Sequence, residues 1–274
     1  MKITKIEPFV VGAPTPGNGK LSDKNYIFVR VHTDEGITGL GEASLGGYTQ
    51  TIIELVNTLA EMLVGEDPTR IEFLQPCMTR QKFWRGGVVK GSAIAGIELA
   101  LWDILGKSLG VPVYKLFGGP CRDKIRVYAN GWTGGSLDPV QVRDKVDEVL
   151  ASGYEAFKFS IAQPSWPVYD PSVTRKIVAI AETIREKIGP ERLLMFDGHG
   201  RYDADSAIAI GNALKDVNLL FFEEPVGQVD ERAMARVTRS IPMPVAAGER
   251  LESKWEFRRL LELEAASILQ PDLA

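Results

Sequence analysis

The chain reads Leu-Leu-Met-Phe-Asp-Gly-His-Gly-Arg over residues 193–201, a short apolar run that ends in Asp197 before a glycine-rich loop. Similar apolar runs end in Glu223, within Leu-Leu-Phe-Phe-Glu, and in Glu249, within Pro-Val-Ala-Ala-Gly-Glu. The acids are equally spaced, because 223 − 197 and 249 − 223 both equal 26. Such an interval suits one strand, one helix and the loops between them, so the spacing predicts successive β/α units.

The ends of parallel strands in such units lie side by side at one rim of the sheet. We therefore expect the carboxylates of Asp197, Glu223 and Glu249 to converge on one point. Three carboxylates without a cysteine suit a hard divalent cation such as Mg²⁺, which prefers oxygen ligands in octahedral geometry. This arrangement would leave room for a substrate carboxylate, and it suits chemistry in which an α-proton leaves and negative charge develops. The alternative is that the acids are ordinary surface residues at strand ends.

Other polar side chains accompany these strands. His199 follows Asp197 by two residues and should share its face, where an imidazole can donate or accept a proton near neutral pH. Lys158, within Ala-Phe-Lys-Phe-Ser, could hold substrate charge, or its side chain could simply extend to the rim. Glu224 should point away from Glu223 and support the site from behind. For His32, far away in a predicted hairpin, we expect a structural role.

Composition places the chain among ordinary globular proteins. Its 274 residues are 45% hydrophobic and 25% charged, enough for one large α/β domain or two domains. The net charge of −4 and the pI of about 5.5 argue against a nucleic-acid partner. Cys77 and Cys121 follow no metal or redox spacing, so we expect free thiols. No apolar run approaches the ~18 residues of a membrane span and the N-terminus lacks a signal-peptide pattern, so we expect a cytoplasmic protein without a membrane partner.

The two parts of the chain, 1–120 and 121–274, have different patterns. The first is predicted to be α+β, with strands at 3–11, 26–32 and 37–43 and helices at 51–63 and 92–108. The second alternates strand and helix, which predicts a parallel sheet. Its strands are expected at 126–129, 156–160, 193–197, 219–223, 245–248 and 268–270. Its helices include 173–188, 204–214 and 231–240. Six such units favour a barrel over an open sheet.

Four motifs resemble the enolase superfamily, in its mandelate racemase/muconate lactonizing enzyme-like branch, over nearly the whole chain. They are the helix at 92–104, Phe-Glu-Glu-Pro at 222–225, Ala-Gly-Glu-Arg at 247–250 and Leu-Gln-Pro-Asp at 269–272. The resemblance implies an α+β capping domain over 1–120 and a modified (β/α) TIM-like barrel over 121–274, with about six of eight strands and hence incomplete at its C-terminus. It also implies Mg²⁺ on the three acids, loops around 14–24 and 45–50 that close over the substrate, and a homo-oligomer.

Within this branch, Asp-x-His-Gly-Arg at 197–201 and Arg-Gly-Gly at 85–87 most resemble acid-sugar dehydratases of the galactonate dehydratase kind. There the histidine after the first metal ligand is the general acid, a role that His199 would take. Family racemases carry Lys-x-Lys where this chain has Lys158 and Ser160, which favours a one-base elimination with Lys158 on the substrate carboxylate. The acid that matches Asp272 orients a base histidine on a seventh strand, beyond the last residue of this chain.

The resemblance therefore implies Mg²⁺-dependent dehydration of a sugar acid, an aldonate such as galactonate, to a 2-keto-3-deoxy acid through an enediolate. His199, Lys158 and Asp272 are the expected catalytic residues. The expected substrate-binding residues are Lys158, Trp132 and Arg250. For Trp132, a role in packing is the alternative. Two alternatives stay open: an epimerase, racemase or cycloisomerase of the same superfamily, and a catalytically inactive truncated chain.

Overall fold

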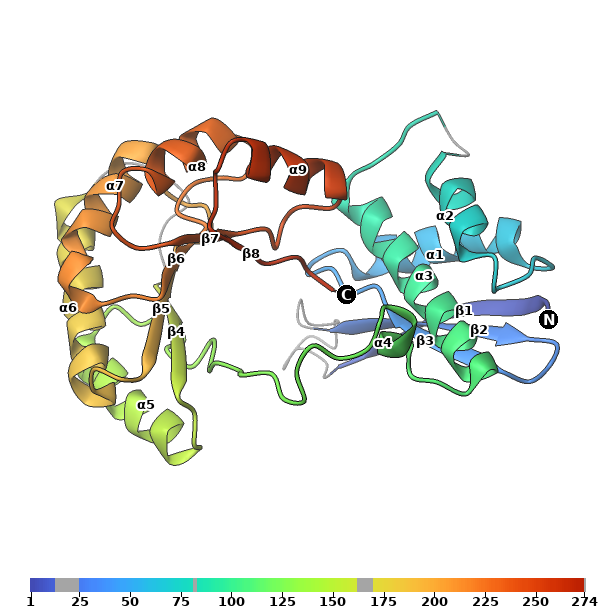
Figure 1. Ribbon diagram of the computed structural model, residues 1–274, viewed down its shortest axis with the longest axis horizontal. Coiled ribbons are helices and arrows are strands. Elements are labelled where there is room, and N and C mark those ends of the chain that lie inside the picture. Colours follow the sequence, from blue (N-terminus) through green and yellow to red (C-terminus); the bar gives the residue numbers. More distant parts are fainter. Residues whose placement is uncertain (13–24, 81–82, 162–169, 274) are drawn as a thin grey trace. The chain divides into compact units, whose positions relative to one another are not determined.

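The computed structural model describes residues 1–12, 25–80, 83–161 and 170–273 (Figure 1). It divides into two compact units. The first comprises Met1–Asp123 together with Leu273, and the second comprises Lys124–Asp272. The sequence placed this boundary between 120 and 121. Of the two loops expected to cover a substrate, 14–24 lies outside the described residues, and 45–50 leads into the first helix.

The first unit is an antiparallel sheet with helices. The strands β1 (Ile3–Val11), β2 (Tyr26–Thr33) and β3 (Thr38–Glu42) pair in the order β1-β2-β3, which confirms the predicted hairpin between β2 and β3. The helices are α1 (Thr49–Leu63), α2 (Ile71–Arg80), α3 (Val88–Leu109) and the short α4 (Val113–Leu116). Apolar side chains of β1, β2, α1, α2 and α3 form one buried core.

Helix α3 lies directly against β3, and glycines make this approach possible. A Cβ atom built on Gly39 would lie 2.0 Å from the carbonyl oxygen of Ala100. One built on Gly41 would lie 2.0 Å from the carbonyl oxygen of Gly96. Because both obstacles are backbone atoms of a long helix, they cannot rotate away as a side chain could. The small residues of α3 and the glycines of β3 thus together allow the helix and the strand to pack at close distance.

We expect Gly41→Ala to lower the free energy of unfolding by about 3 kcal/mol, since the new methyl group must push α3 away from β3. Urea unfolding followed by circular dichroism would measure the change. Gly227→Ala is the matched control, because its built Cβ meets nothing closer than 3.8 Å. Equal stability of the two variants would contradict this account of the β3–α3 contact.

The second unit is built of alternating strands and helices around a parallel sheet. The strands β4 (Ala156–Ser160), β5 (Leu193–Asp197), β6 (Phe221–Glu223), β7 (Val245–Ala247) and β8 (Ile268–Leu269) pair in sequence order. The strand expected at 126–129 is reduced to a single parallel bridge, between Ala129 and Phe157. The expected α/β architecture with a parallel sheet is therefore confirmed for the described part of the chain.

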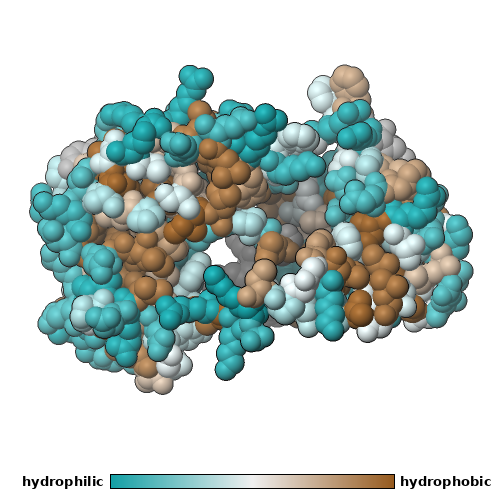
Figure 2. All heavy atoms as spheres, in the orientation of Figure 1, coloured by the Kyte–Doolittle hydropathy of each residue, from teal (hydrophilic) through white to brown (hydrophobic). Residues whose placement is uncertain are grey.

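Helices separate these strands. They are α5 (Pro139–Ala151), α6 (Pro171–Ile188), α7 (Ala204–Ala213), α8 (Glu231–Thr238) and α9 (Lys254–Glu262), with a 3₁₀ turn, η1, at Lys215–Val217. Figure 2 shows mainly hydrophilic side chains at the left-hand edge, where Figure 1 places α6. This matches the amphipathic pattern of α6, whose isoleucines at 177, 180, 184 and 188 are buried. Among the described residues, no helix combines the length and the apolar character that crossing a membrane requires.

Four of these helices begin at an aspartate whose side chain accepts a hydrogen bond from a backbone amide of the first turn. These caps are Asp138, Asp170, Asp203 and Asp230. Asp203 follows the end of β5 by six residues and Asp230 follows the end of β6 by seven. The caps therefore fix the residues at which α7 and α8 begin, and with them the lengths of the loops after β5 and β6. These loops carry the candidate site.

Side chains alternate between the two faces of the parallel sheet. One face carries Phe157, Phe159, Phe196 and Phe222, which are buried in the core shared with the helices. Rings on neighbouring strands contact each other there, with centroids 4.9 Å and 5.0 Å apart for Phe159–Phe196 and Phe196–Phe222. Since successive residues point to opposite faces, Lys158, Asp197 and Glu223 must project from the other face. The phenylalanine ladder thus fixes the direction of the polar residues between its members.

Candidate functional site

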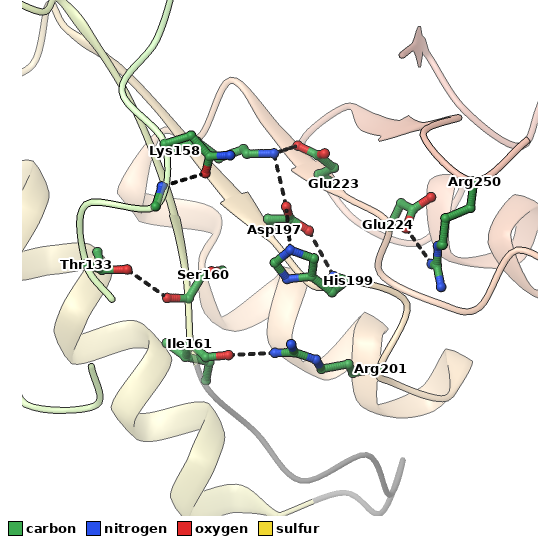
Figure 3. A network of polar contacts seen from close by, with 12 residues as sticks. Thr133, Lys158, Ser160, Ile161, Asp197, His199, Arg201, Glu223, Glu224 and Arg250 are labelled. Carbon is green, nitrogen blue, oxygen red and sulfur yellow. Dashed lines mark hydrogen bonds and ion pairs between the residues drawn. The ribbon is translucent and has the colours of Figure 1, made fainter. Parts of the chain in front are cut away.

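The site centres on the ammonium group of Lys158, which lies between two buried carboxylates (Figure 3). Its Nζ is 3.0 Å from Oδ2 of Asp197 and 2.7 Å from Oε2 of Glu223. The three side chains are at most 5% exposed. Two carboxylates around one ammonium leave a net negative charge in a site almost closed to water. Such a site favours a more highly charged cation.

The protonation of this group follows from its surroundings. Burial by itself would lower the pKa of the Lys158 ammonium, but hydrogen bonds and charge from Glu223 and Asp197 raise that pKa above its ordinary value. Burial and the neighbouring charge of Asp197 raise the pKa of Glu223, against the opposing effect of Lys158. Lys158 is therefore held as a cation, and its ammonium donates hydrogen bonds to both carboxylates.

The register of the strands explains why these side chains meet. Ser160, Asp197 and Glu223 are partners across β4, β5 and β6, and each is the last residue of its strand. Lys158 lies two residues before Ser160 on the same face, so its long side chain extends along β4 to reach the acids. Its Nζ also lies 5.5 Å from the centre of the Tyr128 ring, a cation–π contact.

Backbone hydrogen bonds hold the loop after β5 against the end of β6. The amide of Gly198 donates to the carbonyl of Glu223, and the amide of Gly200 donates to the carbonyl of Glu224. Between them His199 adopts a left-handed backbone with φ of 50°. Non-glycine residues rarely adopt this conformation, and they concentrate at functional sites.

His199 contacts Asp197 through both its backbone and its side chain. Its amide donates to Oδ1 of Asp197 at 2.9 Å, and its Nε2 lies 3.3 Å from Oδ2. The imidazole is 39% exposed, so it can meet a bound molecule while it touches the buried carboxylate. The structure therefore brings together four of the predicted site residues, Lys158, Asp197, His199 and Glu223.

Arg250 and Glu224 form a second polar pair beside the loop. Glu224 has φ of 37° and is 2% exposed, and its carboxylate forms an ion pair with the Arg250 guanidinium. Burial raises the pKa of Glu224, which Arg250 opposes. A Cβ on Gly200 would lie only 2.1 Å from Nη2 of Arg250, so the glycine leaves space for the guanidinium. Arg250, predicted to bind substrate, is held against Glu224 here, and its substrate role stays a prediction.

Glu249 does not join the carboxylate pair. Asp197 and Glu223 end their strands, but β7 ends at Ala247, and Gly248 follows with φ of 140° before the exposed Glu249. In the described ranges, no group of three or more His, Cys, Asp or Glu side chains is arranged to hold a metal ion. The expected convergence of three acids is thus seen for two of them. This pair still fits a hard cation, because its facing oxygens already enclose the Lys158 ammonium.

The remaining predicted residues lie around this centre. The Trp132 indole donates to the carbonyl of Lys158 at 2.8 Å and packs edge-on against Phe157, so packing accounts for its position. Asp272 is exposed, three residues after the end of β8. The sequence pattern did not indicate Tyr128 as a site residue, and it gave Arg201 no role of its own. The Arg201 guanidinium donates to the carbonyl of Ile161 at 2.7 Å. The alternation expected over 126–129 places Tyr128 and Lys158 on one face and could have revealed the former.

We expect Arg250→Met to lower the free energy of unfolding by about 3 kcal/mol, because the buried Glu224 carboxylate loses its partner. Adding Glu224→Gln to this variant should restore part of the loss, since the buried charge is then removed. Urea unfolding of the two single variants and the double variant would measure their coupling. Additive effects of the two substitutions would contradict a direct energetic contact.

Comparison with known protein families identifies both units. Residues 4–118 match the mandelate racemase / muconate lactonizing enzyme N-terminal domain, and residues 141–274 match the enolase C-terminal domain-like family. A solved structure of a member of the enolase superfamily from Salmonella Typhimurium is 31% identical, with a TM-score of 0.89. The alignment covers 99% of this chain and 73% of that one.

Curated relatives carry a more specific name. D-galactonate dehydratase of Variovorax paradoxus (strain S110) is 38% identical over 274 residues, covering 100% of this chain and 68% of the relative. D-galactonate dehydratase of Ralstonia pickettii (strain 12J) is 41% identical over 249 residues, covering 91% and 64%. The chain thus spans about two thirds of the length of these curated relatives.

Proposed function

The chain belongs to the mandelate racemase / muconate lactonizing enzyme family of the enolase superfamily, and we propose that it dehydrates a sugar acid. The proposed substrate is an aldonate such as D-galactonate, and the product is the corresponding 2-keto-3-deoxy acid. Relatives named D-galactonate dehydratase, at 38% and 41% identity, support this substrate class. A homo-oligomer stays a prediction from the family resemblance, and a cytoplasmic location stays a prediction from the sequence pattern.

One observation carries the proposal: the partly exposed imidazole of His199 lies against Asp197 of the buried Lys158–Asp197–Glu223 cluster. A dehydratase needs a proton donor beside the group that binds the substrate carboxylate. His199 is exposed enough to reach a substrate, and Lys158 supplies a positive charge within the same cluster. The loop after β5 places His199 near the carboxylate of Asp197, and β4 places Lys158 near the same carboxylate.

The proposed metal is Mg²⁺, held by Asp197 and Glu223, with Glu249 as the third ligand. The first two are already paired around a cation, and the third follows the next strand of the sheet. When bound, Mg²⁺ would stabilise the negative charge that the substrate acquires as its α-proton leaves.

The chain's own residues would act on the substrate as follows. Lys158 pairs with the substrate carboxylate and makes the α-proton more acidic. Loss of that proton to a base gives an enediolate, and the bond from C3 to its hydroxyl then breaks. His199 donates a proton to the departing hydroxyl, which leaves as water. The resulting enol takes up a proton at C3 and loses the proton of its C2 hydroxyl, which gives the 2-keto-3-deoxy acid.

Two alternatives to dehydration stay open, another reaction of the same superfamily and a catalytically inactive chain. An epimerase or racemase would need a second base facing the substrate, and the position two residues after Lys158 holds Ser160, which is not a base at neutral pH. A cycloisomerase would have no need for a proton donor at His199. A catalytically inactive chain would bind Mg²⁺ or a sugar acid without turnover.

We expect His199→Asn to lower the rate of 2-keto-3-deoxy acid formation from D-galactonate at least about 100-fold, because the hydroxyl then leaves without a proton. Deuterium uptake at the α-carbon from D₂O should persist, since proton abstraction precedes loss of water. A colorimetric assay of the keto acid and proton NMR of the substrate would measure the two steps.

His32→Asn is the matched control, because His32 lies in the first unit and pairs there with Glu7. It should leave the rate unchanged. Full turnover by His199→Asn would remove this residue as the acid. Deuterium exchange by the wild-type chain without loss of water would instead favour an epimerase, and neither exchange nor turnover would favour the inactive chain.

A further inference from the structure

Lys158 has a position that the proposed reaction does not account for. A lysine that pairs with a substrate carboxylate should present its ammonium to the substrate. In the structure that ammonium instead lies between Asp197 and Glu223, at 3.0 Å and 2.7 Å, with its side chain only 5% exposed. It therefore occupies the space where the two proposed metal ligands face each other.

The ammonium and a metal ion cannot share this space. Mg²⁺ binds oxygen at about 2.0–2.1 Å, closer than either of the ammonium contacts, so it would take the same facing oxygens. The other oxygen of Asp197 already accepts the His199 amide at 2.9 Å. Two positive charges between the same carboxylates would also repel each other strongly in a site with little water.

We infer that Lys158 is an internal counterion that holds the carboxylates of Asp197 and Glu223 together until a metal ion displaces it. This inference rests on the metal site proposed above. Without a cation, two buried carboxylates would repel each other, and the carboxyl ends of β5 and β6 carry both of them. Lys158 keeps this rim assembled in the absence of metal.

Displacement would also set the order of binding. Once the ammonium leaves the pair, its positive charge becomes available to a substrate carboxylate. The Tyr128 ring, 5.5 Å from Nζ, offers a π-face that can stay in contact with the ammonium as it moves. Metal binding would therefore prepare the carboxylate-binding group, and a sugar acid would bind tightly only after the metal.

The test is Lys158→Met, studied by thermal unfolding in EDTA and by calorimetric titration with MgCl₂. In EDTA we expect the melting temperature to fall by about 8 °C, because two buried carboxylates lose their counterion. We expect the dissociation constant for Mg²⁺ to fall at least about tenfold, because no ammonium has to be displaced. Mg²⁺ should then raise the melting temperature of the variant more than that of the wild-type chain.

Two further variants keep the test decisive. Lys145→Met removes a half-buried ammonium that binds the carbonyl of Thr133 at 2.9 Å, and it should leave the Mg²⁺ affinity unchanged. If Lys158→Met does not fold, Lys158→Met with Asp197→Asn should fold, because one of the two repelling charges is gone. Failure of this double variant as well would overturn the counterion role.

The calorimetric outcomes separate this inference from the proposed function. Equal Mg²⁺ affinity of the wild-type chain and Lys158→Met would overturn displacement and leave the metal site standing. No Mg²⁺ binding by either protein would overturn the metal site and the displacement together. If Lys158→Met melts at a lower temperature than the wild-type chain in EDTA and binds Mg²⁺ more tightly, the result would support both the metal site and the displacement of Lys158.

Discussion

The contact of one ammonium with two buried carboxylates is the constraint on which the second unit depends. Lys158, Asp197 and Glu223 come from three neighbouring strands, and none of them is more than 5% exposed. Burying ionised groups is costly unless they are paired, so the charges must be brought together by the same folding event that buries them. One face of the sheet thus carries the buried ion pairs of Lys158, Asp197 and Glu223, while the opposite face carries the buried phenylalanine rings.

The alternation of these two faces connects folding to function. The rings of Phe159, Phe196 and Phe222 are locked in the core with the helices, and a shift of register by one residue would exchange them with the polar residues. Such a shift would bury charge against the helices and expose the rings. The hydrophobic core therefore determines where the acids point, although it takes no part in any chemistry.

Much of this architecture can be predicted from the sequence. The limits of β1, β4 and β5 coincide with the predicted ranges, because clear apolar runs define them. The strand at 126–129 was predicted too long. It contributes a single bridge at Ala129, and its apolar residue Val127 is 64% exposed. Local pattern indicated a strand there, but pairing requires a neighbour, which a pattern cannot supply.

The site was predictable where spacing and strand ends coincide. For Asp197 and Glu223 they do, whereas Glu249 keeps the 26-residue interval but lies beyond the end of β7, after a glycine with positive φ. The contacts of Lys158 and Arg250 could not be predicted, because they depend on how far a long side chain reaches. Sequence spacing locates the backbone, and only the packed structure shows which partner a flexible side chain takes.

The most direct test of this account is a crystal structure of the chain with Mn²⁺ in place of Mg²⁺, read by anomalous scattering. We expect an anomalous peak beside the carboxylates of Asp197, Glu223 and Glu249, with the Lys158 ammonium moved out from between the first two. A structure in which the ammonium stays between Asp197 and Glu223, and no peak lies beside them in saturating Mn²⁺, would contradict it.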